Sequence, residues 1–486
     1  MSYAETRYVG RRRPYAVVSD DDVRRIHEAT LDVLATTGCT FHSQRALDVL
    51  EGHDATVDRE STVAKLPPEL IERALGTVPR AFTLGARDPY YDLPVDGEHV
   101  YLTVDGCGVF ARETDGSIRP SLKDDVLDAS RLAHGLDNIG ATAAIVSAQD
   151  CPEASRTLHE LDACLRGSTK HAIVVSAKNA DEARSLIRMA EAVAGGSREL
   201  RERPVFSAIL CTVSPLHQEH GGMELALTLA EAGIPVLLYP MPILGATAPV
   251  TPAGTAVVNN AEVVAAVTAM QLACPGARIA HAGGPTALEM RTGSYFAAVP
   301  ESLLLRAVQA RMAAFYGLPA GLGYGGTKAK EPDAQAAWEN ALAMLLEFLA
   351  GADFVFGSGL LDSSRIYAPE QLVVDDEVFG MVTRILRGVP TDDGSLAVDL
   401  IKRMGFSGDY LFDRHTRDHV HELWRAKLGE TGTYDAWVGA GRPTVAAKAA
   451  VRAQEILAAE PEPFPDDLGR ELDAVIAAAG REAERR

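Results

Sequence analysis

The stretch VFSAILCTVSPLHQEHGGMELALTLAEAGIPVLLY, residues 205–239, shows the pattern that decides the fold. It begins with a short apolar run, 205–211, and ends with another, 236–239. Between them, 222–232 is apolar enough and long enough to form a helix. Short apolar runs flanking a helical segment predict two parallel strands joined by a crossover helix, with both faces of the strands buried.

The same unit recurs through the middle of the chain, which predicts an α/β fold. Eight runs qualify as strands: His99–Val104, Ala141–Ser147, Ala172–Ser176, Val205–Cys211, Val236–Tyr239, Ile279–His281, Leu318–Leu322 and Phe354–Phe356. Helical segments separate most of them: Lys123–His134, Ser155–Arg166, Ala180–Ala194, Gly222–Ala232, Val257–Leu272, Glu301–Tyr316 and Asp333–Ala350. Eight units favour a closed (β/α)₈ barrel, of the TIM type, over an open doubly wound sheet.

Helices are expected on both sides of this barrel. Residues 20–38 carry apolar side chains at helical spacing, with acidic residues in the first turn and Gly38 at the end. Shorter helices are expected at 43–50 and 68–75, and amphipathic segments follow the last strand. We therefore divide the chain into an N-terminal helical cap (1–95), the barrel (96–370) and a C-terminal helical extension packed on the barrel (371–486).

Composition narrows the function classes. A formal charge of −20 repels phosphates, so nucleic acid is not an expected partner. The six cysteines include no C-x-x-C pair, which fits separate reduced thiols. We see no signal peptide or membrane span, so we expect a cytoplasmic protein that does not associate with a membrane.

Polar side chains and glycines follow the predicted strands, at the barrel end where active sites form. Asp105 follows the first strand, Tyr239 ends the fifth and His281 ends the sixth. Glycines at several strand ends permit close approach of a large ligand, although tight turns require glycine as well.

Metal binding is not expected. His217 and His220 lie close together without an obvious third ligand, and the group His415, His419 and His421 lies on a polar segment. A catalytic zinc site uses about three convergent protein ligands. The polar segment around His415, His419 and His421 favours a solvated helix face over a metal site.

The central block PMPILGATAPVTPAGTAVVNNAEVVAAVTAMQLACPGARIAHAGGPTALEMRTGSYFAAVPE (240–301) resembles the trimethylamine methyltransferase family. So do the block FYGLPAGLGYGGTKAKEPDAQAAWENALAMLLEFLAGADFVFGSGLLDSS (315–364), the segment ATTGCTFHS (35–43) and the segment GDYLFDRHT (408–416). The resemblance spans nearly the whole chain. The founding enzymes of the family carry pyrrolysine, so a chain of standard residues resembles the non-pyrrolysine branch, which includes glycine betaine methyltransferase.

The resemblance implies a barrel that moves a methyl group from a betaine-like quaternary amine, or a tertiary one, to cob(I)alamin on a separate corrinoid protein. In that setting Tyr239, Tyr324 and Phe356 are candidates for an aromatic cage around a cationic head, with Asp105 nearby. Three further residues are candidates to hold a substrate carboxylate: His281, Thr327 and Lys330. Three glycines are candidates for cofactor contact: Gly283, Gly325 and Gly326.

One departure from the family pattern affects the substrate. An acidic residue is expected in a TDxK-like turn near the seventh strand, and Thr327–Lys328–Ala329–Lys330 stands there instead. The charge of Lys328 either disfavours a cationic substrate or binds a carboxylate. The residues alone also leave open a cobalamin-independent lyase or hydrolase on the same barrel, and a barrel that only binds small ligands. We expect a homo-oligomer.

Overall fold

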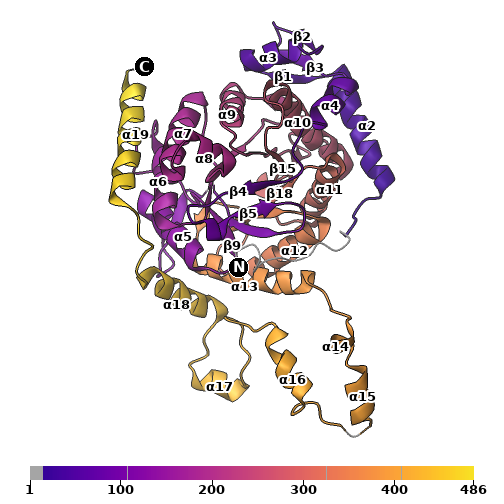
Figure 1. Cartoon of the computed structure of the whole chain (residues 1–486), viewed down its shortest axis with the longest axis vertical. Coiled ribbons are helices and arrows are strands. Elements are labelled where there is room, and N and C mark those ends of the chain that lie inside the picture. Colours follow the sequence, from indigo (N-terminus) through magenta and orange to yellow (C-terminus); the bar gives the residue numbers. More distant parts are fainter. Residues whose placement is uncertain (1–14, 107, 324–325, 407, 486) are drawn as a thin grey trace.

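The structure is a computed structural model, and it describes residues 15–106, 108–323, 326–406 and 408–485. Its centre is a closed barrel of eight parallel strands (Figure 1). In chain order the strands are β6 (Tyr101–Val104), β9 (Ile139–Ala143), β10 (His171–Val174), β11 (Phe206–Leu210), β13 (Val236–Leu238), β15 (Ile279–Gly283), β18 (Ala320–Gly323) and β19 (Phe354–Ser358). Each strand pairs with the next along the chain, and β19 pairs with β6 to close the barrel. The predicted barrel is confirmed.

A ring of helices surrounds the strands, because each crossover must bury its apolar side against the sheet. The ring consists of α5 (Lys123–Gly135), α6 (Arg156–Gly167), α7 (Ala180–Ala194) with the short α8 (Ser197–Glu202), α9 (His220–Glu231), α10 (Pro252–Ala273), α11 (Pro300–Tyr316), α12 (Ala334–Ala350) and α13 (Pro369–Leu386). Helix α13 packs between α12 and α5 and so completes the ring. The boundary that we placed at 370 therefore falls at the start of this helix.

The N-terminal part contains the three expected helices and several strands that the sequence did not predict. The helices are α2 (Asp20–Thr36), α3 (Gln44–Glu51) and α4 (Pro68–Leu75). Strands β1 (Cys39–Phe41), β2 (Thr56–Asp58) and β3 (Val63–Lys65) form a small sheet with β12 (His217–Gln218). Helix α2 begins at a capping box in which Ser19 and Asp22 bond each other's backbone. Gly38 follows it with φ +85°, where a Cβ would lie 2.5 Å from the Ala64 carbonyl oxygen.

A hairpin covers the end of the barrel at which the strands begin. It consists of β4 (Phe82–Leu84), the short helix η1 (Pro89–Tyr91) and β5 (Leu93–Val95). The buried imidazole of His171, at the start of β10, donates from Nδ1 to the Gly85 carbonyl at 2.7 Å. The Tyr101 hydroxyl donates to the Pro94 carbonyl at 2.8 Å. These bonds join the hairpin to the first residues of two barrel strands.

Short strands extend the loops at the opposite end, where the barrel strands finish. One group pairs β7 (Phe110–Arg112) and β8 (Ile118–Pro120) with β20 (Leu360–Leu361) and β21 (Ile366–Tyr367). Another pairs β14 (Ile243–Leu244) with the hairpin β16 (Thr286–Glu289) and β17 (Ser294–Phe296). These additions build the walls of the barrel mouth.

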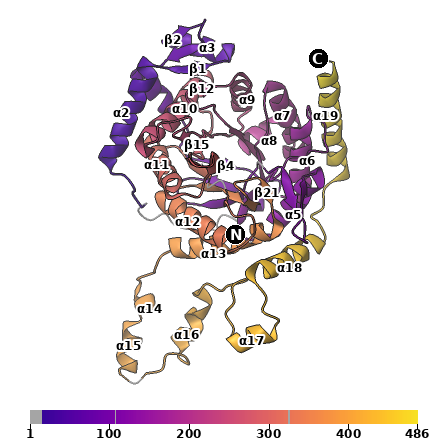
Figure 2. The same ribbon diagram turned by 180° about the vertical axis from the view of Figure 1, so that it is seen from behind.

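The last hundred residues are helical, as expected, but only part of them pack on the barrel. Helix α18 (Val445–Ala458) contacts α13 and α5, and α19 (Asp466–Glu484) contacts α7 and α6. Between α13 and α18 lie α14 (Asp393–Leu396), α15 (Val398–Met404), α16 (Arg414–His419), η2 (Val420–Glu422) and α17 (Tyr434–Gly439). Both ribbon views show these short helices standing away from the ring (Figures 1 and 2).

The core contains a buried ion pair between two ring helices and one unusually apolar helix. Arg306 of α11 and Glu347 of α12 form an ion pair at 2.6 Å, with both side chains fully buried. Burial raises the pKa of Glu347 to about 7, against the lowering effect of the guanidinium. Within the described residues, α10 is the one helix that is apolar and long enough to span a membrane. The rest of the structure buries 78% of its most apolar segment, as expected for a core helix of the ring.

Candidate active site

A cavity of about 270 Å³ opens at the end of the barrel where the strands finish. Its lining comes from many different strand ends and from the added hairpins. The lining residues are Asp105, Gly106, Val175, Ile209, Cys211, Tyr239, Met241, Tyr295, Phe356, Ser363 and Ser364. In barrels of this type this end carries the active site, because the loops there are free to vary on a rigid frame.

Asp105 supplies the charge in this lining. One carboxylate oxygen accepts the Gly106 backbone N–H at 2.8 Å, and the other accepts the Ser364 hydroxyl at 2.7 Å. These bonds fix the direction of the carboxylate. Among the described residues that line the cavity, Asp105 is the one with a formal charge, so the cavity favours a cationic ligand.

Aromatic rings form the facing wall. Tyr239 and Phe356 meet edge to face, with ring centroids 6.0 Å apart and an interplanar angle of 86°. Tyr239 follows β13, and its ring lies directly over two glycines. A Cβ on Gly323 would lie 1.5 Å from the Tyr239 hydroxyl oxygen, and one on Gly284 would lie 2.9 Å from it. Glycine at these two positions leaves the space that the tyrosine ring occupies.

Tyr295 reaches the cavity from the hairpin β16–β17 and is held there through its backbone. The Lys328 ammonium donates to the Tyr295 carbonyl at 3.0 Å, and the Ser363 hydroxyl donates to the same oxygen at 3.4 Å. Lys328, whose charge raised the question of substrate type, therefore ties the hairpin to the loop after β18.

Buried carboxylates from the helix ring support the loops around the mouth. Glu160 of α6 accepts hydrogen bonds from Ser147, the Ala148 N–H and the Ser176 hydroxyl, in two neighbouring loops. In the same way Glu262 of α10 accepts bonds from Thr212, Ser214 and the Leu216 N–H in the loop after β11. Burial raises the pKa of Glu262, while these donors lower it.

The loops after the last two strands have equivalent supports. Glu339 of α12 accepts the Thr327 hydroxyl and the Lys328 N–H. Asp375 of α13 accepts the Gly359 N–H at 2.8 Å. Buried polar groups in such networks rigidify the backbone that they hold, because each is costly to leave without a partner.

The cavity also contains two sulfur side chains. Met241 lies in the loop after β13, and Cys211 follows β11. The Cys211 side chain is exposed at the cavity surface, and the protein atoms around it raise the pKa of its thiol to about 11. Cys211 is therefore a neutral thiol at pH 7 and a weak nucleophile.

Three residues predicted for the site do meet there: Asp105, Tyr239 and Phe356 all line the cavity. His281 lies elsewhere. It is fully buried, its Nε2 lies 3.3 Å from Asn260 Oδ1 of α10, and its Nδ1 lies 3.4 Å from Gln309 Nε2 of α11. The side chain therefore points from β15 toward the helices, and burial lowers its pKa to about 4.

The two other residues predicted to hold a carboxylate bond to the chain itself. Thr327 is fully buried against Glu339. Lys330 is largely exposed and pairs with Asp362. Neither belongs to the cavity lining.

The glycines predicted for cofactor contact have protein atoms where a ligand would lie. A Cβ on Gly283 would meet the Gln309 amide nitrogen at 2.7 Å, and one on Gly326 would meet the Leu360 carbonyl oxygen at 3.1 Å. These positions therefore do not form an open cradle for a cobalamin. The other predicted residues, Tyr324 and Gly325, lie outside the described residues.

Several residues of the lining were not among the predicted site residues, including Cys211, Met241, Tyr295, Ser363 and Ser364. Tyr295 and the two serines come from hairpins inserted after the sixth and eighth strands, which the strand-end rule does not reach. Cys211 directly ends a predicted strand, so its position was the available signal.

The described residues contain no group of three or more His, Cys, Asp or Glu side chains arranged to hold a metal ion. His217 bonds Thr40 and stacks on His42 in the N-terminal sheet. The histidines 415 and 419 contact each other on a short helix far along the chain from the barrel strands.

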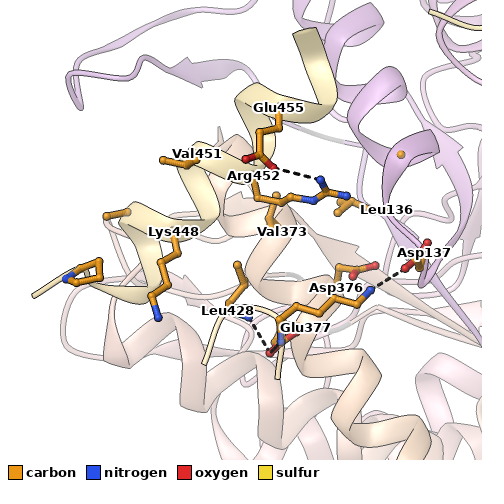
Figure 3. Close-up of a pocket in the computed structure, with 14 residues that line it drawn as sticks. Leu136, Asp137, Val373, Asp376, Glu377, Leu428, Lys448, Val451, Arg452 and Glu455 are labelled. Carbon is orange, nitrogen blue, oxygen red and sulfur yellow. Dashed lines mark hydrogen bonds and ion pairs between the residues drawn. The ribbon is translucent and has the colours of Figure 1, made fainter. Parts of the chain in front are cut away.

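A second cavity, of about 420 Å³, lies outside the barrel between α13, α18 and the turn after α5 (Figure 3). Apolar side chains line its centre, including Leu136, Val373 and Val451. Charged residues around it pair with one another, as Arg452 does with Glu455 at 3.3 Å. It contains no barrel strand end, so the cavity at the mouth is the candidate active site.

Comparison with known proteins gives one consistent result. The profile of the trimethylamine methyltransferase family matches residues 2–484. A trimethylamine methyltransferase of Desulfitobacterium hafniense is 32% identical over 460 residues, which cover 94% of this chain and 92% of the relative. A glycine betaine methyltransferase of the same species is 29% identical over 472 residues, covering 96% and 98%.

Among solved structures, the monomethylamine methyltransferase of Methanosarcina barkeri matches with a TM-score of 0.50. The match covers 96% of this chain and 94% of that one, at 13% sequence identity. At this level of identity the likeness concerns the fold alone.

Proposed function

Because this chain belongs to the trimethylamine methyltransferase family, and is thus a methyltransferase, we propose that it removes a methyl group from a methylated amine bound in the mouth of the barrel. The relatives are named for trimethylamine and for glycine betaine. The observation that carries the proposal is the pairing of one fixed carboxylate, Asp105, with an aromatic wall in a cavity of about 270 Å³.

The lining suits a cationic methylammonium group. Its positive charge is spread over methyl groups, which contact ring faces favourably and do not require hydrogen-bond acceptors. Tyr239, Tyr295 and Phe356 offer rings, and Asp105 offers the opposite charge. We propose that these four side chains hold the cationic head, with one N-methyl group directed out of the barrel.

A quaternary nitrogen leaves as a neutral amine when it loses a methyl group. The chain then needs no acid to protonate the leaving group, and its main task is to orient the carbon–nitrogen bond. The neutral thiol of Cys211 is in keeping with that task. We propose that the substrate is a quaternary amine in preference to a tertiary one.

We propose that the methyl acceptor is reduced cobalamin, which supplies a strong nucleophile and is held by a separate corrinoid protein. A Cβ on Gly283 or Gly326 would meet protein atoms, so neither glycine opens a cradle on the side of its Cβ. A cytoplasmic location is also part of the proposal. The described cysteines are all free thiols, which suits a reducing compartment.

The test is a methyl-transfer assay with the purified chain and free cob(I)alamin, followed by the absorbance of methylcobalamin. The substrates are trimethylamine, tetramethylammonium, choline and glycine betaine. Asp105→Asn keeps the size of the side chain and removes its charge, so we expect KM for the active amine to rise about tenfold or more, since hydrogen bonds and contacts to a charged group are worth about 1.5–3 kcal/mol.

Ser364→Ala is the matched control, because it removes one bond to the carboxylate and leaves the charge in place. We expect a smaller rise in KM for this variant. Absence of methylcobalamin with every amine, from a folded chain, would refute the proposed function. Equal KM values for Asp105→Asn and the wild type would refute the role of the carboxylate.

A further inference from the structure

Three consecutive residues beside the cavity have a left-handed backbone. Asp362, Ser363 and Ser364 have φ values of +53°, +54° and +63°, and they lie between β20 and β21. Residues other than glycine have a steric penalty in this region and normally occupy it one at a time. The five other non-glycine residues with positive φ in the described chain all stand singly. Backbone strain is therefore concentrated in this segment, which we call the left-handed turn (362–364).

Closing the hairpin of β20 and β21 does not require this conformation. Leu361 pairs with Ile366, so four residues form the loop, and the Arg365 N–H donates to the Leu361 carbonyl at 3.0 Å. Hairpin loops of this length are most often built around a type I turn, which serine and aspartate adopt readily. Glycine would also occupy the left-handed region without a clash. Strain that the hairpin does not require points to a function of the groups that the turn presents.

One of these groups holds the charge of the cavity. Ser363 and Ser364 both belong to the cavity lining. Ser364 is buried, and its hydroxyl donates to the Asp105 carboxylate at 2.7 Å. The left-handed turn thus fixes one oxygen of the carboxylate that we assign to the cationic head.

The backbone of the turn holds another part of the wall through the loop after β18. The N–H groups of Asp362 and Ser363 donate to two carbonyls of the segment 327–329, at 2.9 and 2.8 Å. In the middle of that segment is Lys328, whose ammonium donates to the Tyr295 carbonyl at 3.0 Å. The Ser363 hydroxyl lies 3.4 Å from the same oxygen. The turn therefore supports the hairpin that carries the tyrosine ring.

The two supported groups come from loops far apart in the sequence. Asp105 follows the first barrel strand, and Tyr295 lies on the hairpin after the sixth. An ammonium head gains from the carboxylate and from the ring together only when it contacts both. The spacing of the two groups therefore determines which size of head binds best, and a rigid spacing discriminates against added methylene groups.

We propose that the left-handed turn sets the spacing between Asp105 and Tyr295, and that this spacing selects the size of the ammonium head. Ser364 and Lys328 are positioning residues, because each acts through the group that it holds. The inference rests on the proposed function, since it requires that the cavity binds a methylated ammonium group.

The test is calorimetric titration of the full chain with tetramethylammonium and with tetraethylammonium, which needs neither cobalamin nor methyl transfer. The wild type is expected to bind the smaller cation about tenfold or more tightly, because added methylene groups in a pocket of fixed size cost about that factor. The readout is the ratio of the two Kd values. A change of charge near the cavity alters both Kd values alike, so the ratio reports the spacing.

The first pair of variants is Ser364→Ala and Ser364→Gly, which lose the same hydroxyl. In both, the Kd ratio is expected to fall by about threefold or more, since one hydrogen bond is worth about 2- to 12-fold in an equilibrium constant. Alanine keeps the strained Cβ and glycine does not, so the urea midpoint is expected to be higher for Ser364→Gly. Equal loss of discrimination at unequal stability is the signature of a positioning residue.

Lys328→Met removes the ammonium that holds the Tyr295 carbonyl and is expected to lower the Kd ratio in the same way. Ala397→Gly is the matched control. Ala397 also has a positive φ, of +49°, but it lies between α14 and α15 and is not in the cavity lining. This variant is expected to keep the Kd ratio of the wild type.

A chain that forms methylcobalamin from an amine but binds the two cations equally, or binds neither, would overturn this inference alone. Absence of both binding and methylcobalamin would overturn the proposed function as well. An unchanged Kd ratio in the Ser364 variants and in Lys328→Met would also overturn the inference. So would a ratio that falls only in the less stable Ser364 variant, because the loss would then follow stability.

Discussion

Gly323→Ala is the perturbation that best tests how the aromatic wall is built. Gly323 ends β18 and lies under the Tyr239 ring, so the new Cβ would be 1.5 Å from the hydroxyl oxygen and 2.7 Å from Cζ. Gly323 does not have a positive φ, unlike many glycines of this chain, so alanine is not strained in the backbone. The effect therefore reports the contact with Tyr239.

The magnitude follows from the displacement and from what it removes. Ordinary contacts begin at 3.4 Å, so the end of the tyrosine ring must move by about 2 Å. Inserting a methyl group into a packed site costs about 1–3 kcal/mol of stability. A ring moved off the cation loses about 1–2 kcal/mol of cation–π attraction, which corresponds to a fall in kcat/KM of about 5- to 30-fold.

The assay compares kcat/KM for methyl transfer with the Kd for the same amine by calorimetry, which does not depend on the acceptor. Both constants should worsen by the same factor, since the ring acts on binding. Gly480→Ala is the control, because no atom lies within 4 Å of its Cβ position. A folded Gly323→Ala enzyme with both constants within twofold of the wild type would refute the placement of Tyr239 in the substrate site.

Two other predictions concern stability. Burial lowers the pKa values of His171 and His281 to about 4, so between pH 6.5 and 4 the unfolded chain binds protons that the folded chain does not, and the free energy of unfolding falls as the pH is lowered. Urea unfolding should show a loss of about 2 kcal/mol per histidine between pH 7.5 and 5. In His281→Gln this loss should be smaller by about 2 kcal/mol, and a loss equal to that of the wild type would contradict the assignment. Arg306→Met leaves Glu347 buried without its partner and should lower the free energy of unfolding by about 3–5 kcal/mol. The double variant Arg306→Met/Glu347→Met removes both charges and should lose far less. Equal losses of unfolding free energy in the two variants would show that the charge pair is not the cause.

The sequence predicted the barrel well because its signals are local. Each barrel strand is a short apolar run buried on both faces, and each crossover helix is long enough to recognise by spacing. The strands β1, β2 and β3 were missed because each has only three residues, too few to show an alternation of apolar and polar side chains. The pairing of β1 with β12 also joins segments far apart in the sequence.

The site was predicted only in part, for a related reason. Position at a strand end identified Asp105, Tyr239 and Phe356, but it does not say which face of a strand a side chain occupies. His281 lies among apolar neighbours on a fully buried strand, so no polar and apolar alternation indicates its direction. Its partners Asn260 and Gln309 come from two helices, and only the folded chain brings the three together.

The carboxylates that support the mouth have a consequence for evolution. Glu160, Glu262, Glu339 and Asp375 brace the loops from behind, while the side chains that face the cavity, such as Val175 and Ile209, belong to none of these networks. Selection can therefore exchange the inner surface one residue at a time while the braces keep the backbone in place. A barrel of this construction is a suitable parent for directed evolution toward amines of other sizes, with the bracing carboxylates held constant.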